Sequence, residues 1–159
     1  MERDVISRPI RDIVRNDVPT VRPHDTVRET LQILLDQNLP AVAVVNHEGR
    51  FLGVVSQCDL VGMTRELVED LSDLTRIQEV LMKWLDQNVK EVGSDRRKVA
   101  AIMSQDVPTV RPNCLIIEAA RVLLNSRSGC LPVVNETGNL EGVVFLQDLL
   151  SIFLEEVSE

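Results

Sequence analysis

Residues 17–23 read Asp-Val-Pro-Thr-Val-Arg-Pro, and residues 106–112 read the same seven letters, 89 positions later. The same shift aligns residues 17–60 with residues 106–149 without a gap, and 19 of these 44 positions are identical. Agreement of this extent is far above chance. The chain is therefore one structural unit written twice, and every later inference follows from that repeat.

The composition favours a compact protein that does not bind nucleic acid. The chain has 159 residues, 44% of them apolar, which suffices for one compact domain or two small interlocked ones. Its net charge is −8 and its longest basic run is residues 96–98, whereas a groove that follows a phosphate backbone needs a basic stripe. No apolar run approaches the ~18 residues needed to span a bilayer, so we expect no membrane segment.

The cysteines indicate a reducing compartment. Cys58, Cys114 and Cys130 fit no zinc-binding spacing, and their odd number argues against a disulfide framework. The amino terminus lacks the apolar core of a signal peptide. We therefore expect a cytoplasmic protein with reduced thiols.

Each copy predicts the same order of elements: a short helix, a brief extended piece, an amphipathic helix, a hairpin of two strands and a second helix. In the first copy Thr26 and Glu29 form a capping-box pattern at the start of the amphipathic helix. The strands around residues 41–45 and 51–55 are apolar at nearly every position, so we expect both faces of the sheet to be covered. The apolar residues of the amphipathic helix in copy one fall on one predicted face, namely Val27, Leu31, Leu34 and Leu35.

A helical insert separates the copies. We expect repeat 1 over residues 1–62, the insert over residues 63–98 and repeat 2 over residues 99–159, with the two repeats intertwined. Leucines of the insert recur at four-three spacing, which favours a long helix that ends near Gly93. Either this helix packs on its own chain or it pairs with another subunit.

The strongest candidate for a functional site is the stretch Gly-Val-Val-Ser-Gln-Cys-Asp-Leu at residues 53–60. A strand ends at Ser56 and a helix begins, so free N–H groups and the helix dipole favour an anion there. The Ser56 hydroxyl suits a phosphate oxygen, and the Asp59 carboxylate suits the two hydroxyls of a ribose. Ser-x-x-Asp is equally a helix cap with an acid in the first turn. Asp148 repeats the acid in copy two, which favours a shared polar ligand.

The double unit resembles a pair of cystathionine-β-synthase (CBS) domains, also called a Bateman module. The resemblance covers the chain from about residue 10 to residue 149. It is carried by Ile102-Met103 before the Val-Pro-Thr-Val stretch, by Leu-Pro-Val-Val-Asn at residues 131–135, and by Gly-Val-Val-x-x-x-Asp-Leu in both copies. It implies an α/β fold of the α+β type, in which tandem β-α-β-β-α units each follow a short leading helix.

The resemblance also implies the ligand and its site. Such pairs bind AMP, ADP, ATP, S-adenosylmethionine or sometimes NAD between the two repeats, with the aspartate on the ribose and the Ser or Thr on the phosphate. Asp148 is then expected to face Thr20, Pro23, Ala41 and Val42. Ser56 and Asp59 are expected to face a corresponding set from the other copy, namely Thr109, Pro112, Cys130, Leu131 and Pro132.

Two departures from the family pattern predict unequal sites. Phe145 stands where copy two should have Ser or Thr, so the Asp148 site lacks a hydroxyl for the phosphate. Many relatives carry a basic residue before the second strand, where this chain has Ala41 and Cys130. AMP or S-adenosylmethionine is therefore a better candidate than ATP. ATP would need another basic residue in place of the missing one, and the arginines available for this are more typical of a solvated surface, namely Arg22, Arg111 and Arg127.

Three functions remain open. The first is a sensor without catalytic activity that needs no cofactor or metal, binds an adenosine-type ligand and transmits a change of pose to an unknown regulated protein, as a homodimer. The second is a dimerising or scaffolding module whose ligand sites are vestigial. The third is redox sensing through Cys58. Catalysis is disfavoured because His24 lies at a helix start and His47 in a turn, which leaves no nucleophile with a base.

Overall fold

The computed structural model describes residues 7–57, 98–126 and 129–157. Repeat 1 contains η1 (Ile10–Asp12), β1 (Thr20–Val21), α2 (Val27–Asp36), β2 (Ala41–Val45) and β3 (Phe51–Ser56). Repeat 2 contains η3 (Val99–Ala101), α5 (Ile116–Leu124), β4 (Cys130–Val134), β5 (Leu140–Phe145) and α6 (Leu146–Val157). The second helix of copy one and the long helix of the insert were predicted within residues that lie outside this description.

The two sheets follow the predicted order of strands, with one difference. In repeat 1, β1 pairs in parallel with β2, and β2 pairs antiparallel with β3. In repeat 2, β4 and β5 form the same hairpin, but the extended piece makes only an isolated bridge between Val110 and Val133. Pro132 stands at the position of Ala43 in copy one and has no N–H to donate, so the second rung of the ladder is lost there.

The two hairpin turns confirm the sequence pattern. Gly49 has a φ of 84° and Gly138 a φ of 89°, values that side-chain-bearing residues rarely adopt. In each turn an asparagine side chain closes the loop: the Asn46 Oδ1 accepts from two backbone N–H groups, and the Asn135 Oδ1 does the same. The turns are therefore built alike in both copies.

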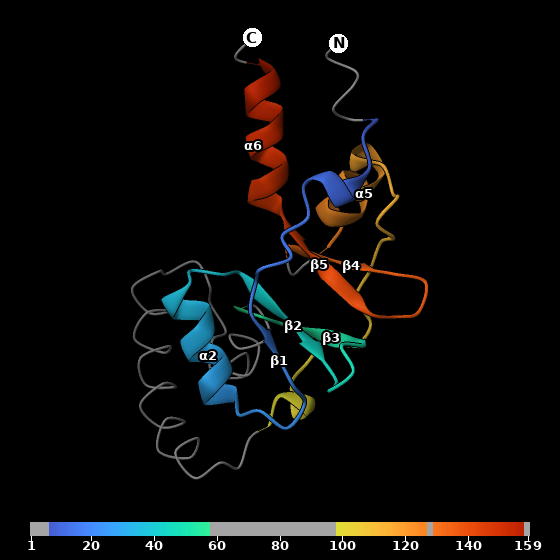
Figure 1. The fold of residues 1–159 in the computed structure, drawn as a ribbon. Helices are drawn as coiled ribbons and strands as arrows, with labels where there is room; N and C mark the ends of the chain where they lie inside the picture. The colour runs from blue at the N-terminus through green and yellow to red at the C-terminus, as the bar shows by residue number, and fades with distance from the viewer. Residues whose placement is uncertain (1–6, 58–97, 127–128, 158–159) are drawn as a thin grey trace, which may run out of the picture.

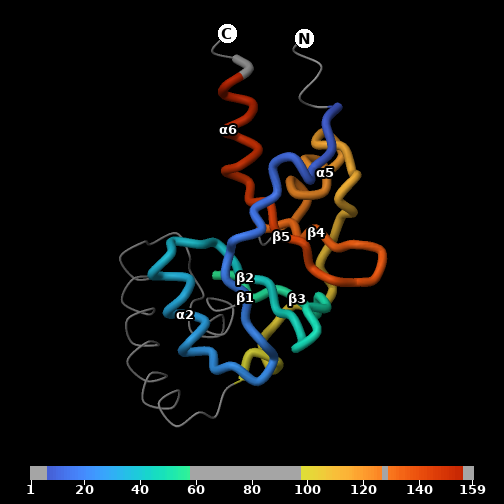
Figure 2. The backbone as a smooth tube through the Cα atoms, in the orientation of Figure 1, coloured from blue at the N-terminus to red at the C-terminus, as the bar shows by residue number. Residues whose placement is uncertain are grey.

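The leading segments of the repeats are exchanged. The blue amino-terminal segment runs beside α5 before it descends to β1, and the yellow η3 lies beside repeat 1 before the chain climbs to α5 (Figure 1, Figure 2). Accordingly, the Ile10 N–H donates to the Cys114 carbonyl at 2.6 Å, and the Val99 N–H donates to the Asp25 carbonyl at 2.8 Å. Each repeat thus contributes its first helical turn to the other repeat.

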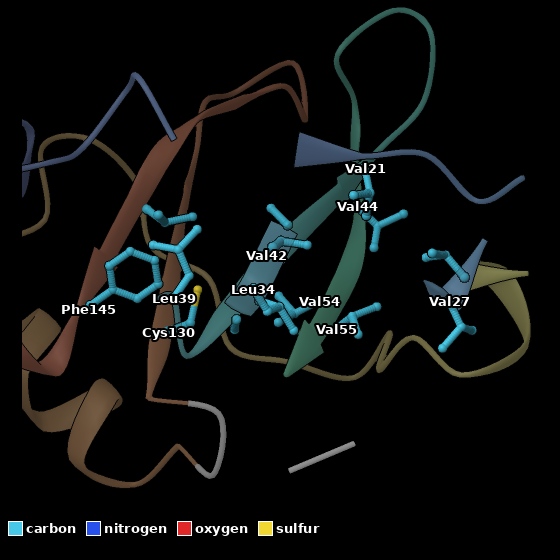
Figure 3. Close-up of a cluster of buried hydrophobic side chains, with 14 residues drawn as sticks. Val21, Val27, Leu34, Leu39, Val42, Val44, Val54, Val55, Cys130 and Phe145 are labelled. Carbon is cyan, nitrogen blue, oxygen red and sulfur yellow. The ribbon is translucent and has the colours of Figure 1, made fainter. Parts of the chain in front are cut away.

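The cores reflect this exchange. Both central strands, β2 and β4, are buried at every position, as their continuous apolar runs predict. One cluster of buried side chains combines α2 and the first sheet with Val143, Phe145 and Cys130 of repeat 2. The close-up shows Phe145 and Cys130 beside Leu39 at the edge of this cluster (Figure 3). The second cluster combines repeat 2 with Ile10.

The predicted apolar face of α2 is too wide by one residue. Val27 and Leu34 are buried and Leu31 is partly buried, but Leu35 is 62% exposed. At 100° per residue, Leu35 lies about 80° around the helix from Val27, beyond the edge that meets the sheet. Its counterpart Leu124 on α5 is 70% exposed. Both copies therefore leave a leucine uncovered at the same place.

Candidate functional site

Ser56 is the last residue of β3, and its side chain is 2% exposed. Gln57 follows it and anchors the strand end, since its N–H donates to the Pro40 carbonyl at 3.0 Å and its side-chain amide donates to the Leu39 carbonyl at 2.9 Å. Cys58 and Asp59 lie outside the described residues. The Ser56 half of the predicted first site therefore sits on a well-anchored strand end.

A segment of repeat 2 crosses β3 just before Ser56. Ser104 and Val54 exchange two backbone hydrogen bonds of 2.8 and 3.0 Å. A Cβ on Gly53 would lie 2.7 Å from the Ser104 carbonyl oxygen, so only glycine allows this approach. The glycine that begins the predicted motif is therefore a consequence of the crossing, and the crossing brings repeat 2 to the strand that ends in Ser56.

The equivalent crossing occurs on β5 of repeat 2. Arg15 is 89 residues before Ser104, and it exchanges backbone hydrogen bonds of 2.9 and 3.0 Å with Val143. A Cβ on Gly142 would overlap the Arg15 carbonyl. The two crossings occupy equivalent positions of the repeat. The residue that bonds to β3 is Ser104, whereas the residue that bonds to β5 is Arg15. That exchange of residue type makes the two ends chemically different.

Asp148 is already engaged at the start of α6. Its Oδ2 accepts from the Phe145 N–H at 2.9 Å, which is the helix-cap role that the sequence allowed. Its Oδ1 accepts from the Nε of Arg15 at 2.9 Å and from the Nη2 at 2.5 Å. The Asp148 side chain is 14% exposed in this arrangement. Both carboxylate oxygens of Asp148, the residue predicted to bind a ribose, therefore already accept hydrogen bonds from the protein.

Phe145 and Arg15 complete the arrangement. Phe145 is 1% exposed and belongs to the core shared by the two repeats. The Cζ atom of Arg15 lies 5.3 Å from the centre of its ring, within the range of a cation–π contact. At the position where copy one has a serine, copy two thus has a buried ring with a guanidinium above it.

Sequence reasoning missed Arg15. The hydrogen-bond partners that the structure gives Asp148 are Arg15 and Phe145, whereas the four residues expected to face it across a ligand remain a prediction. Among those four, Thr20 is exposed, Pro23 is half-buried, and Ala41 and Val42 are buried in β2. When the alignment is extended two residues upstream of residue 17, Arg15 aligns with Ser104, but this is one of many differences between the copies and does not point to Asp148.

The residues expected opposite Ser56 are mostly strand residues. Thr109 is exposed and Pro112 is half-buried. The other three lie within β4 and are buried, namely Cys130, Leu131 and Pro132. Leu131 packs into the repeat 2 core, whereas Cys130 packs into the core shared with repeat 1. Their assignment to a ligand remains a prediction.

The arginines that might compensate for the missing basic residue are partly accounted for. The Arg111 guanidinium donates to the Asn135 carbonyl in the hairpin turn of its own repeat. Arg22 is exposed at the end of β1. Arg127 lies outside the described residues. A triphosphate therefore gains no support from Arg111 in this arrangement.

Neither described cysteine has the character of a reactive thiolate. Burial raises the pKa of the Cys130 thiol to about 12. Partial burial raises the pKa of Cys114, and the neighbouring Glu118 carboxylate adds to the shift by charge and by hydrogen bonding. Both thiols are therefore protonated at neutral pH, as expected for packing residues.

Across residues 7–57, 98–126 and 129–157, no three side chains of the His, Cys, Asp and Glu types gather to hold a metal ion. Within the same ranges, no helix is both long and apolar enough to cross a bilayer.

The architecture defines a module of two interlocked α+β repeats, and comparison with known proteins identifies it. The family model for the CBS domain matches residues 10–66 and again residues 99–155. The chain belongs to the CBS-domain family, and the fold class expected from the sequence is confirmed.

The relatives include proteins of similar length. An uncharacterised protein of Methanocaldococcus jannaschii, MJ1426, is 23% identical over 91% of this chain and 90% of its own length. The chloroplastic CBSX1 of Arabidopsis thaliana is 25% identical, and the matched region spans 56% of that protein. The crystal structure of CBSX2 from Arabidopsis thaliana matches with a TM-score of 0.74 and 21% identity, over 96% of this chain and 99% of that one. CBSX2 has also been solved in complex with AMP, and that structure matches with a TM-score of 0.70, 21% identity and the same coverage.

Proposed function

We propose that this chain is a regulatory module without catalytic activity that binds an adenosine-type ligand, such as AMP, ADP, ATP or S-adenosylmethionine, between its two repeats. The ligand would lie at the Ser56 end of β3, with the Ser56 hydroxyl toward a phosphate and the Asp59 carboxylate toward the ribose. No cofactor is required. A shift in the relative pose of the repeats would then be read by a partner protein.

The observation that carries this proposal is the exchange of leading segments. Repeat 2 crosses β3 at Val54, two residues before Ser56, so a ligand at the strand end would touch both repeats. A ligand that bridges two units can favour one pose over another, which is the physical requirement for a sensor. The AMP complex of CBSX2 supports the choice of ligand class.

Thermal unfolding of nucleotide-free protein tests the proposal. A ligand present at a hundred times its dissociation constant stabilises the folded state by about 2.7 kcal/mol. For a chain of this length that corresponds to a rise in melting temperature of roughly 5–11 °C. We expect such a rise with at least one of AMP, ADP, ATP and S-adenosylmethionine, and none with inosine monophosphate at the same concentration.

The outcome that contradicts the proposal is equally clear. If none of the four ligands shifts the melting temperature of protein shown by absorbance to be free of nucleotide, the sites are vestigial. The chain would then be a dimerising or scaffolding module.

One observation favours that second function in its own right. The carboxy-terminal helix α6 buries Leu149 but leaves Leu150 57% and Leu154 69% exposed. Leu35 of α2 and Leu124 of α5 are exposed as well, which adds to the apolar surface that a single chain leaves in water. A symmetric homodimer would cover it, and dimerisation is compatible with either function.

We place the protein in the cytoplasm as part of this proposal. Three cysteines in a chain of this size fit no disulfide framework, and such thiols persist in a reducing compartment. The redox alternative depends on Cys58, which lies outside the described residues. Retention of ligand binding after mild oxidation would remove that alternative.

A further inference from the structure

We infer that Arg15, Phe145 and Asp148 form a clasp that occupies the second nucleotide position, so that each chain binds one ligand at the Ser56 end and none at the Asp148 end. This inference rests on the proposed function for its ligand, but the clasp itself is a structural statement.

First, Asp148 has little capacity left for a ribose. A carboxylate that binds two vicinal hydroxyls uses both of its oxygens. Here Oδ1 already accepts two hydrogen bonds from the Arg15 guanidinium, and Oδ2 accepts one from the Phe145 N–H. A ribose would have to displace a charge-assisted pair and replace it with neutral hydrogen bonds, which are roughly half as strong.

Second, Arg15 is held where it is by more than its ion pair. Its backbone is bonded to Val143 in both directions, at 2.9 and 3.0 Å. Its side chain is only 36% exposed and lies over the Phe145 ring at 5.3 Å. The guanidinium is therefore positioned by the crossing of the leading segment and does not need a ligand to bring it there.

Third, the Ser56 end of the module differs from the Asp148 end at two matched positions. Ser104 replaces Arg15 at the matching crossing, and Ser56 replaces Phe145 at the matching strand end. The guanidinium and the ring that close the Asp148 end are therefore both replaced by serines at the matching positions of the Ser56 end.

Isothermal titration of the full chain with AMP is the first test. We expect one AMP per chain in the unmodified protein, and two per chain would overturn the clasp while leaving the proposed function intact. Arg15→Ser is then compared with Arg11→Ser, which removes the same charge from an exposed position in the same segment. We expect Arg15→Ser to change the affinities for AMP and for adenosine by less than twofold. A loss of tenfold or more for AMP, with adenosine unaffected, would instead show that Arg15 binds the phosphate.

A double-mutant cycle tests the clasp without any ligand. Asp148→Asn keeps an oxygen for the Phe145 N–H but loses the charge that pairs with Arg15. We expect Arg15→Ser and Asp148→Asn each to lower the melting temperature by roughly 2–8 °C, and the double variant to melt no lower than the worse single one. Additive losses would overturn the clasp. If the unmodified protein binds no nucleotide at all, the proposed function fails and this cycle alone decides the clasp.

Discussion

The positions that distinguish the two halves are few, and they lie at corresponding places. Ser56 and Phe145 occupy the same position in the two repeats, yet one is a buried hydroxyl-bearing residue and the other a ring in the shared core. Asp148 has taken the role of a helix cap and ion-pair partner. Asp59 and Asp148 occupy equivalent positions, but they are therefore predicted to have different roles: Asp59 binds the ligand, and Asp148 caps α6 and pairs with Arg15.

The aspartates can be separated by their effects on affinity and stability. Asp59→Ala is expected to weaken AMP binding about 10–150-fold, since hydrogen bonds to a charged group contribute about 1.5–3 kcal/mol. Asp148→Ala is expected to leave the AMP affinity within about twofold and to lower the melting temperature, because it breaks the pair with Arg15. Titration calorimetry and thermal unfolding of both variants check this. Equal losses of affinity would contradict the ranking of the two sites.

Cys130 predicts a loss of stability at alkaline pH. Its folded-state pKa of about 12 lies above the ordinary thiol value of 9.0, so the folded protein holds the proton more tightly than the unfolded chain does. This contribution is complete below pH 9 and is lost as the pH rises from 9 toward 12, by about 1.4 kcal/mol per pH unit. Denaturant unfolding at pH 8, 9, 10 and 10.5 measures it.

The matched control is Cys130→Ala, because Ala41 is the residue that copy one has at this position. The variant removes the titrating thiol, so the difference in stability between it and the unmodified protein should shrink as the pH rises above 9. Parallel curves over the whole range would show that the thiol is not protected by folding.

Among the elements, the two crossings, rather than the helices, join one repeat to the other. Each leading segment lies against a strand of the other repeat at a glycine, Gly53 on β3 and Gly142 on β5. The exchange explains why Ile10 is fully buried although it lies near the amino terminus: it belongs to the core of repeat 2. Neither repeat completes its own core, so the two are expected to unfold together.

Gly142→Ala tests the crossing. A methyl group there would overlap the Arg15 carbonyl, and a backbone segment cannot relax as a side chain can. We expect a loss of about 3 kcal/mol in the free energy of unfolding, at the upper end for overpacking. Hydrogen exchange should also lose protection at the amides of Arg15 and Val143.

Gly49→Ala is the control for that variant. Nothing lies within 4 Å of its added Cβ, so it carries only the strain of a positive φ, about 1–2 kcal/mol. The amides of Arg15 and Val143 should keep their protection in this variant. Protection that survives in Gly142→Ala as well would show that the crossing does not depend on the glycine.

For the molecule as a whole, the open question is what covers the leucines of α6. Leu154→Glu replaces an exposed leucine of α6 by a charged residue, and we expect it to convert a dimer of twice 17.9 kDa into a monomer. Light scattering after gel filtration measures the mass. Ser151→Glu adds the same charge at an exposed position about 60° around the helix from Leu154 and should leave the dimer intact.

The same variant separates the two proposed functions. A monomeric Leu154→Glu protein that still binds AMP shows that ligand binding belongs to the single chain. If the unmodified protein is already a monomer at micromolar concentration, the scaffolding function loses its support and the exposed leucines need another explanation.

Much of this fold could be predicted from the residues alone. The repeat of 44 positions at an offset of 89 residues, the buried apolar strands and the glycines with positive φ in both turns can be read from short stretches of sequence, and the structure agrees with each of them. Local patterns are reliable here because hydrophobic periodicity and turn chemistry act over a few residues. The prediction that Leu35 belongs to the buried face of α2 was wrong, since the edge of a buried face depends on what packs beside it.

The candidate site was predictable only in part. The repeat drew attention to Asp148, whose role in ligand binding remains a prediction, but its ion-pair partner lies 133 residues earlier in the chain. No spacing rule connects Arg15 to Asp148, because their contact arises from the exchange of leading segments between the repeats. The repeat and its family followed from the order of the residues; which end of the module remains open to a ligand depends on a guanidinium that only the folded chain brings to the carboxylate.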